Sequence, residues 1–147
     1  MTGKLYIVAT PIGNLSDITI RAVDILKNVD LVLAEDTRHS KKLFAHYEIE
    51  TPLRPFHEHN EKDKTEAIIN EINAGKSIAM ISDAGTPLIS DPGYHLVTTA
   101  KKIGLNVIPI PGPSALITAL SSSGLASNSF TFFGFLPSKP VARLKFL

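Results

Sequence analysis

The segment "ISDAGTPLISDPG", residues 81–93, holds the densest group of chemically useful residues in the chain. It contains two Ser-Asp pairs, two glycines and two prolines, and it follows the apolar run "SIAMI". Asp83 and Asp91 supply carboxylates, whereas the segment has no lysine or arginine. Loops this rich in glycine and proline hold the backbone in tight, defined conformations. The segment is therefore a candidate for binding a ligand through carboxylates, hydroxyls and exposed backbone.

Four other polar segments follow runs that are typical of β-strands: "TPIGNLSD", "EDTRHSKK", "HEHNEKDK" and "PGPSA". In open α/β sheets, ligands bind beyond the carboxyl ends of the strands. Three of these five segments are rich in glycine or proline. Tight turns explain any one such loop as well as a ligand does. Three such loops at the same edge of a sheet favour a shared ligand.

The composition of these loops limits the class of ligand that they can bind. The chain has no GxGxxG and no GxxxxGK[ST] motif, which disfavours a standard dinucleotide site and a P-loop. The glycine-rich loops also lack the lysine and arginine that suit a triphosphate. Aspartate, serine and threonine beside exposed backbone suit a ribose, an adenine edge and a cationic or zwitterionic group. S-adenosylmethionine, which carries a sulfonium and an amino-acid tail, is a ligand of this kind.

The segment "EDTRHSKK" combines acidic and basic residues directly after a predicted strand. Its charged residues are Glu35, Asp36, Arg38, His39, Lys41 and Lys42. One interpretation is a solvated helix start with an acidic first turn. The other is a carboxylate at a cleft, with basic residues beside it that contact phosphates. The sequence leaves both interpretations open.

The histidines are weaker candidates for function. His57 and His59 have a spacing that metal ligands can use, but no third ligand can be identified in the sequence. A solvated polar loop is therefore the favoured interpretation, and no metal is expected. His46 and His95 lie within helical patterns and are interpreted as structural.

The elements that must position these loops alternate regularly along the chain. Strands are predicted at residues 5–9, 30–34, 53–56, 77–81, 106–110 and 130–135, and helices at 17–29, 61–75, 93–104 and 113–124. Strand starts about 25 residues apart suit a strand followed by a helical crossover. Runs such as "SIAMI" and "DLVLA" are continuously apolar, which is typical of strands buried on both faces. The prediction is a doubly wound, mostly parallel α/β sheet with helices on both faces.

Local signals define the ends of these helices. Asp17 is the predicted N-cap of the first helix, whose apolar face is formed by Ile20, Val23, Ile25 and Leu26. The later helices are predicted to end at Gly75, Gly104 and Gly124, because glycine is common just after the last helical turn.

The composition is that of a globular protein. Of the 147 residues, 44% are hydrophobic and 20% are charged, which is inconsistent with disorder. The apolar runs fall far below the roughly 20 residues that span a bilayer, and no secretory signal is expected. The absence of cysteine excludes disulfides and suits a reducing cytoplasm. A net charge of +1 gives no global signature of nucleic-acid binding, so RNA would have to bind at a local basic patch.

The C-terminal part of the chain departs from the regular alternation. After the predicted strand at 130–135, "LPSKPVARLKFL" has the pattern of a turn and the first turns of an amphipathic helix. We therefore expect an α/β domain at residues 1–125, followed at 126–147 by a linker and the start of a truncated C-terminal domain.

Four segments carry a resemblance to a known family: "LYIVATPIGNLSDITIRAVDIL", "DLVLAEDTRHSKKLF", "ISDAGTPLISDPG" and "IPGPSALITAL". In this order they resemble the small-subunit ribosomal RNA methyltransferase I family, within the tetrapyrrole methylase superfamily. The resemblance extends through essentially the whole chain. It implies S-adenosylmethionine-dependent methylation of a cytidine ribose 2′-hydroxyl in 16S rRNA of the small ribosomal subunit. It also implies a two-domain, cytoplasmic homodimer with the cofactor between its domains and no attachment to a membrane.

The resemblance assigns roles to individual residues. It implies that the cofactor is bound by Pro11, Ile12, Gly13, Ala84, Gly85, Thr86, Pro87, Ile89, Ser114 and Ala115. Thr86 stands where the superfamily motif has aspartate, so the hydrogen bonding of that motif is not carried over unchanged. The acidic residue that some tetrapyrrole relatives place at the end of the second strand corresponds to Asp36.

The implied chemistry is an in-line displacement that depends on alignment of two bound partners. A carboxylate that accepts the proton of the weakly acidic 2′-hydroxyl would assist it. Asp36 is the first candidate for that role, followed by Asp83 and Asp91. Arg38, His39, Lys41 and Lys42 are the candidates for RNA contacts.

Two other functions remain open at this point. One is methylation of a corrin or porphyrin precursor with the same cofactor, and the other is a non-catalytic nucleotide-binding α/β domain. Under the implied two-domain arrangement, the 147 residues alone are expected to be inactive or nearly so.

Overall fold

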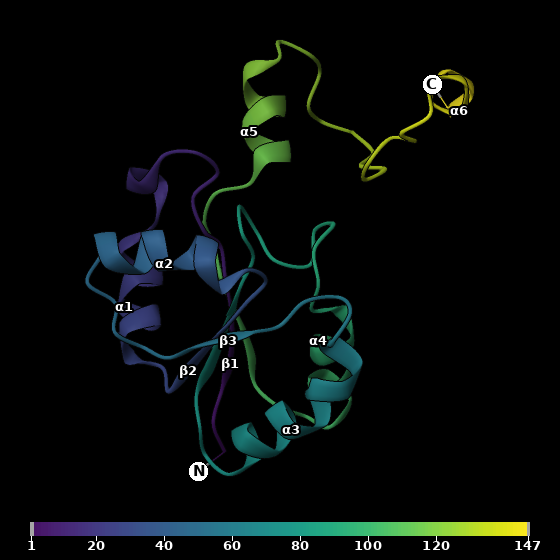
Figure 1. The fold of residues 1–147 in the computed structure, drawn as a ribbon. Helices are drawn as coiled ribbons and strands as arrows, with labels where there is room; N and C mark the ends of the chain where they lie inside the picture. Colours follow the sequence, from purple (N-terminus) through teal and green to yellow (C-terminus); the bar gives the residue numbers. More distant parts are fainter. Residues whose placement is uncertain (1, 147) are drawn as a thin grey trace.

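The computed structural model describes residues 2–146 and contains one sheet of five parallel strands. The strand order is β3-β2-β4-β1-β5 (Figure 1). The strands are β1 (Leu5–Val8), β2 (Leu31–Ala34), β3 (Leu53–Pro55), β4 (Ile78–Ile81) and β5 (Val107–Ile110). The predicted α/β fold class is confirmed, and five of the six predicted strands are present.

Helices cover both faces of this sheet. The helices on the sheet are α1 (Ile20–Asn28), α2 (Thr37–His46), α3 (Glu61–Asn73) and α4 (Tyr94–Lys102), and a short 3₁₀ turn η1 (Leu15–Asp17) precedes α1. Helices α5 (Ala115–Ser122) and α6 (Pro140–Phe146) have no buried residue and lie away from the sheet (Figure 1). Helices α1 and α2 pack on one face, and α3 and α4 pack on the other. Within residues 2–146, no helix is both long and apolar enough to cross a membrane.

Two apolar cores hold the helices against the sheet. Phe56, Ile68 and Leu96 belong to the core under α3 and α4, whereas Leu26 and Phe44 belong to the core under α1 and α2. All four residues of β2 and all four of β4 are buried, as their continuously apolar sequences predicted. Burying one large aliphatic side chain contributes about 1.5–3 kcal/mol, so these cores make the sheet a rigid support for its loops.

The strand register brings the carboxyl ends of the central strands to one level. Ala34, the last residue of β2, lies opposite Ile81, the last residue of β4. On the other side of β4, Ile7 of β1 lies opposite Met80. The loops after β1, β2 and β4 therefore leave the sheet side by side, where open α/β sheets bind ligands.

The start of α1 differs from the prediction. Its N-cap is Thr19, whose Oγ1 accepts a hydrogen bond from the N–H of Ala22 at 3.1 Å. Asp17 ends the preceding 3₁₀ turn, and Ile20 is 83% exposed. Ile18, just before the cap, is buried instead. The helix thus begins later than predicted, because the threonine hydroxyl is placed to cap it while the isoleucine before it enters the core.

The predicted strand at residues 130–135 is wrong. No strand follows β5 in the described chain up to residue 146, and Phe132, Phe133 and Phe135 are exposed. Strand propensity reflects a fit to a pleated, half-buried surface. This segment runs away from the sheet and has no neighbouring strand there (Figure 1). The predicted helix after residue 136 is present as α6, and the division of the chain at residue 125 stays a prediction.

Helices α3 and α4 are joined by a buried carboxylate. Glu61 at the start of α3 is 7% exposed, and its Oε1 accepts hydrogen bonds from the backbone N–H groups of His95 at 2.6 Å and Leu96 at 3.1 Å. The N-cap of α4 is Gly93, which has no side chain to satisfy these donors. Glu61 therefore caps α4 from a neighbouring helix.

Replacing Glu61 with alanine is expected to lower the free energy of unfolding by about 1–3 kcal/mol, because two backbone N–H groups lose their partner. Urea unfolding would measure the loss. Glu66→Ala, an exposed substitution on the same helix, is the matched control and should change stability by less than about 0.5 kcal/mol. Equal losses in the two variants would show that Glu61 has no capping role.

Candidate active site

Three loops at the carboxyl edge of the sheet are connected by direct hydrogen bonds. Thr10 after β1 and Gly85 after β4 form an antiparallel bridge, with N–H···O distances of 2.9 and 3.0 Å. The Thr10 hydroxyl also donates to the carbonyl of Ser82 at 3.1 Å. The Thr86 hydroxyl donates to the carbonyl of Pro113, in the loop after β5, at 3.1 Å. The three loops that are rich in glycine or proline therefore form a single cluster.

One cavity of about 250 Å³ lies between the loops after β4 and β5 and is called here the β4/β5 cavity. Six of the ten predicted cofactor-binding residues line it, namely Ala84, Gly85, Thr86, Ile89, Ser114 and Ala115. Phe132 and Phe135 also line it, from the segment before α6. Its lining contains no lysine, arginine or histidine.

A second cavity of about 260 Å³ lies between the loop after β1 and helix α2 and is called here the β1/α2 cavity. Pro11 and Gly13 line this cavity, although the resemblance placed them with the cofactor residues. Of the other two predicted cofactor residues, Ile12 lies beside Gly85 and Pro87 is buried. The structure therefore divides the predicted cofactor residues between two places.

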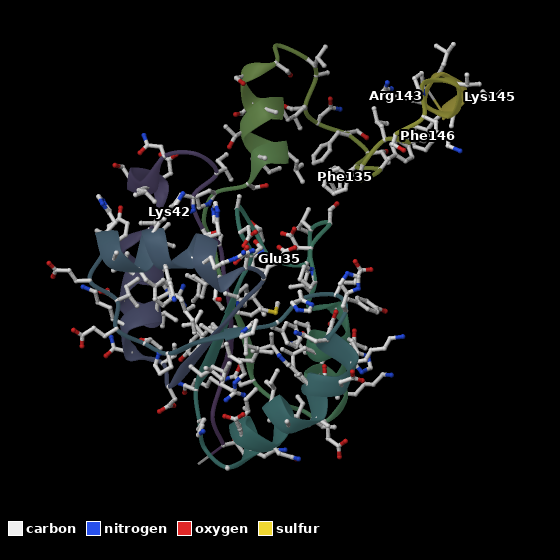
Figure 2. The ribbon with its side chains drawn as sticks, in the orientation of Figure 1. Glu35, Lys42, Phe135, Arg143, Lys145 and Phe146 are labelled. Atoms are coloured by element: carbon white, nitrogen blue, oxygen red, sulfur yellow. The ribbon has the colours of Figure 1, made fainter. Side chains whose placement is uncertain are left out.

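The four basic residues predicted to contact RNA are also divided. His39 and Lys42 line the β1/α2 cavity. Arg38 is turned toward Asp36, with its Nη2 2.8 Å from Asp36 Oδ2. Lys41 is exposed and is not part of the lining. Figure 2 shows Lys42 on α2 and Glu35 at the edge of the sheet where the loops gather.

Asp36 is occupied by local interactions. It is the N-cap of α2, and its Oδ1 accepts hydrogen bonds from Arg38 N–H at 2.8 Å and Arg38 Nε at 3.1 Å. The hydrogen bonds from Arg38 lower the pKa of Asp36 to about 2. The structure thus shows the helix start of the first interpretation, in which Asp36 caps α2 and pairs with Arg38. A carboxylate of such low basicity is a poor proton acceptor.

Glu35, the residue before Asp36, has the opposite electrostatic environment. Burial raises the pKa of its carboxyl above the ordinary value, and the charges of Asp83, Asp91 and Asp36 raise it further. Burial also raises the pKa of Asp91, and the charge of Asp83 adds to that effect. Asp83 Oδ1 accepts the backbone N–H of Asp36 at 3.1 Å, which joins the loops after β4 and β2. The four carboxylates therefore form one cluster at the edge of the sheet.

Glu35 also stands at a strand end in the sequence, but the family resemblance points to Asp36. The signal that favours Glu35 is its position directly after Ala34, the last buried residue of β2. A carboxyl group there emerges at the sheet itself, where burial makes it a stronger base. Asp36, one residue further on, has the position and the residue type of a helix N-cap.

Neutralising Glu35 is expected to stabilise the fold at neutral pH. Because its pKa in the folded chain is raised, the folded state binds more protons than the unfolded state. Stability therefore falls as the pH rises from the ordinary carboxyl pKa, about 4.3, through the folded pKa. Glu35→Gln should melt at a higher temperature than the unsubstituted chain at pH 7.

The same difference should shrink as the pH is lowered below about 4, where Glu35 becomes protonated in both states. Thermal melts monitored by circular dichroism across this pH range would measure it. Glu50→Gln, at an exposed position, serves as the control and should show no such pH-dependent gain. A variant that is less stable than the unsubstituted chain at pH 7 would contradict the assigned environment of Glu35.

The remaining histidines do not form a metal centre in the part of the chain that the structure describes, residues 2–146. The rings of His57 and His59 lie edge to face with centroids 5.9 Å apart. Nε2 of His57 lies 2.9 Å from the Asn60 side-chain amide, while its Nδ1 is buried without a hydrogen-bond partner. His46 packs edge to face against Tyr47.

Two groups of known proteins are similar to this chain. The first are proteins named ribosomal RNA small subunit methyltransferase I. The relative from Vibrio cholerae is 59% identical over 95% of this chain and 48% of its own length. The relative from Xylella fastidiosa is 60% identical over 96% and 52%, and that from Synechocystis is 53% identical over 99% and 52%. The chain spans about half the length of these relatives.

The second group consists of solved structures. Uroporphyrin-III-C-methyltransferase from Thermus thermophilus superimposes with a TM-score of 0.65 at 23% identity, over 86% of this chain and 55% of that one. The native form of uroporphyrin III C-methyl transferase from the same organism gives a TM-score of 0.62 at 19% identity, over 80% and 52%. At these identities the likeness shows a shared fold.

A family model covers nearly the whole chain. The model is described as Tetrapyrrole (Corrin/Porphyrin) Methylases and matches residues 4–140. This match includes the five-stranded parallel sheet, the three connected loops and both cavities. The chain therefore belongs to the tetrapyrrole (corrin/porphyrin) methylase family.

Proposed function

We propose that the protein to which this chain belongs uses S-adenosylmethionine to methylate the ribose 2′-hydroxyl of a cytidine in 16S rRNA of the small ribosomal subunit. The observation that carries this proposal is the 53–60% identity, over at least 95% of the chain, to proteins named ribosomal RNA small subunit methyltransferase I. The two adjacent cavities support it, because methyl transfer needs a donor and an acceptor held side by side.

The β4/β5 cavity fits the cofactor by its charge and by the size of its residues. Its lining contains no cationic side chain that would repel a sulfonium. Ala84, Gly85 and Ala115 have small side chains that leave room in the cavity, while Ser114 offers a hydroxyl. Thr86, which replaces the aspartate of the superfamily motif, holds two of the loops together through Pro113. When bound, S-adenosylmethionine would supply an electrophilic methyl group.

A proton must leave the 2′-hydroxyl as it reacts, and the carboxylate cluster can accept it. Asp36 was the first candidate, but its pairing with Arg38 makes it a weak base. We place the proton on Glu35 instead, because burial and three neighbouring carboxylates make it a stronger base. Asp36 then has a positioning role, because it caps α2 and its N–H holds Asp83.

The whole protein is proposed to be a cytoplasmic homodimer. In this arrangement the second half of the protein closes the cofactor site from the other side, and residues 126–147 lead into it. Arg38, His39, Lys41 and Lys42 are the proposed contacts to the RNA backbone. The 147 residues alone should then bind the cofactor weakly and transfer no methyl group.

Methylation of a tetrapyrrole precursor is the second candidate, favoured by the description of the family and by the uroporphyrin methyltransferase structures. Identity to those structures is only 19–23%, far below that to the ribosomal relatives. A non-catalytic nucleotide-binding domain is a third possibility, and it predicts ligand binding without any methyl acceptor.

The test uses this chain and a version extended by the second half that its relatives carry. Calorimetric titration with S-adenosylmethionine and S-adenosylhomocysteine should show binding by the extended protein and little by the 147 residues. Labelled S-adenosylmethionine should then transfer its methyl group to small ribosomal subunits from a strain that lacks the enzyme, and not to uroporphyrinogen. Transfer to the tetrapyrrole would favour the second candidate, and binding without transfer to either would favour the third.

A further inference from the structure

The two cavities are lined by consecutive residues of one short piece of chain. Ser82 and Asp83 line the β1/α2 cavity, and the next two residues, Ala84 and Gly85, line the β4/β5 cavity. The bridge between Thr10 and Gly85 fixes this piece of chain to the loop after β1. Molecules in the two cavities are therefore held next to each other along a single, well-braced loop.

The charges around the cavities distinguish their occupants. His39 and Lys42 line the β1/α2 cavity, and neither takes part in an ion pair within residues 2–146. Nearby Arg38, in contrast, is paired with Asp36. The β4/β5 cavity has no basic lining residue. A cationic sulfonium is thus favoured in the β4/β5 cavity, and an anionic phosphate is favoured beside Lys42.

The lining of the β1/α2 cavity suits a nucleoside. Apolar contacts come from Pro11, Leu15, Leu43 and Ile81, and polar groups are contributed by Thr10, Ser82 and Asp83. Apolar surface can cover the faces of a flat base, while a few polar groups read its edge. Asp83 Oδ1 is used by the N–H of Asp36, which leaves Oδ2 to accept a hydrogen bond from an exocyclic amino group.

The size of the cavity agrees with this occupant. Its volume is about 260 Å³, just below the range of about 300–1,000 Å³ that is typical of small-molecule sites. That is room for one nucleoside rather than for a macrocycle. Proteins recognise the unstacked bases of single-stranded RNA by their faces and edges, and a pocket of this size can enclose one such base.

We propose that the β1/α2 cavity holds the RNA nucleoside that accepts the methyl group, with its base in the cavity and a flanking phosphate at Lys42 and His39. This inference rests on the proposed function and adds the location of the acceptor. It predicts that the acceptor base carries an exocyclic amino group, because Asp83 is a hydrogen-bond acceptor at the cavity wall.

Leu15→Trp in the extended protein tests the location directly. Leu15 lies in the 3₁₀ turn, lines the cavity and is 36% exposed, so a larger side chain there can fill the cavity without disturbing the core. The KM for small ribosomal subunits should rise by about tenfold or more. The Kd for S-adenosylmethionine should stay within about twofold, because that site is separate. Ile103→Trp, at a 52% exposed position beyond α4, is the matched control and should change neither value.

A pair of neighbouring lysines tests the phosphate contact. Lys42→Gln should weaken RNA binding and reduce its salt slope by about 1, and it should cost more affinity than Lys41→Gln, which removes the same charge outside the cavity. Fluorescence anisotropy with labelled small-subunit RNA, at several salt concentrations, would measure both. Comparable losses would mean that α2 attracts RNA only by its general charge, and would overturn the phosphate assignment.

Three outcomes separate this inference from the proposed function. If the unsubstituted extended protein methylates RNA and Leu15→Trp leaves the KM for RNA unchanged, the acceptor lies elsewhere and the inference is wrong. The same conclusion follows if Leu15→Trp weakens cofactor and RNA binding equally. If the unsubstituted protein itself transfers no methyl group to RNA, the proposed function is wrong. The acceptor assignment, which rests on that function, is then wrong as well.

Discussion

Glu35→Gln in the extended protein is expected to reduce kcat for RNA methylation by about 100- to 10,000-fold, the usual contribution of a general base. The KM for RNA and the Kd for S-adenosylmethionine should change little, because glutamine keeps the size and shape of the side chain and removes only its charge. Single-turnover methyl transfer from labelled cofactor, together with calorimetry, would separate these quantities.

The pH profile provides the distinguishing measurement for Glu35. In the unsubstituted enzyme, kcat should rise with pH through the raised pKa of Glu35 and then level off, because only the ionised carboxyl accepts a proton. Glu35→Gln should lack this rise. A loss of activity that came only from altered folding would lower the whole profile and keep its shape.

Asp36→Asn is the companion variant. Asparagine can still cap a helix but loses the charge that pairs with Arg38, so we expect a modest loss of activity and an intact rise with pH. If Asp36→Asn removes turnover while Glu35→Gln retains it, the original assignment of Asp36 as proton acceptor is the correct one.

Gly93→Ala is expected to destabilise the fold by about 2–6 kcal/mol. Gly93 has φ +120°, and a Cβ at this position would lie 2.3 Å from Cε and 2.9 Å from Sδ of Met80. Met80 is 2% exposed, in the core under α3 and α4, so its side chain has little room to move away. The expected loss combines backbone strain of about 1–3 kcal/mol with overpacking of about 1–3 kcal/mol.

Gly104→Ala is the matched control for Gly93→Ala. Its φ of +76° is also positive, but a Cβ there would meet no atom within 4 Å. This variant should lose only the backbone contribution, about 1–2 kcal/mol. Urea unfolding of both variants isolates the contact with Met80, and equal losses would show that the core accommodates the extra methyl group.

The sequence by itself determined the layout of the protein. Continuously apolar runs such as 77–81 predicted strands buried on both faces, and β4 is entirely buried. Glycines and prolines after strands predicted the loops that the structure connects through Thr10 and Gly85. These features are local, because a buried strand or a tight turn requires particular residues whatever lies beyond it. The resemblance added a methylase family, which the family model confirms.

Only the tertiary structure decided how neighbouring residues divide their roles. Glu35 and Asp36 are adjacent carboxylates, yet burial raises the pKa of one and Arg38 lowers the pKa of the other. Pro11 and Gly13 line a different cavity from Gly85, although the family resemblance assigned all three residues to the cofactor site. The segment at 130–135 has strand composition but no strand beside it. Electrostatics, cavities and strand pairing all depend on which distant residues come close, and no short stretch of sequence contains that information.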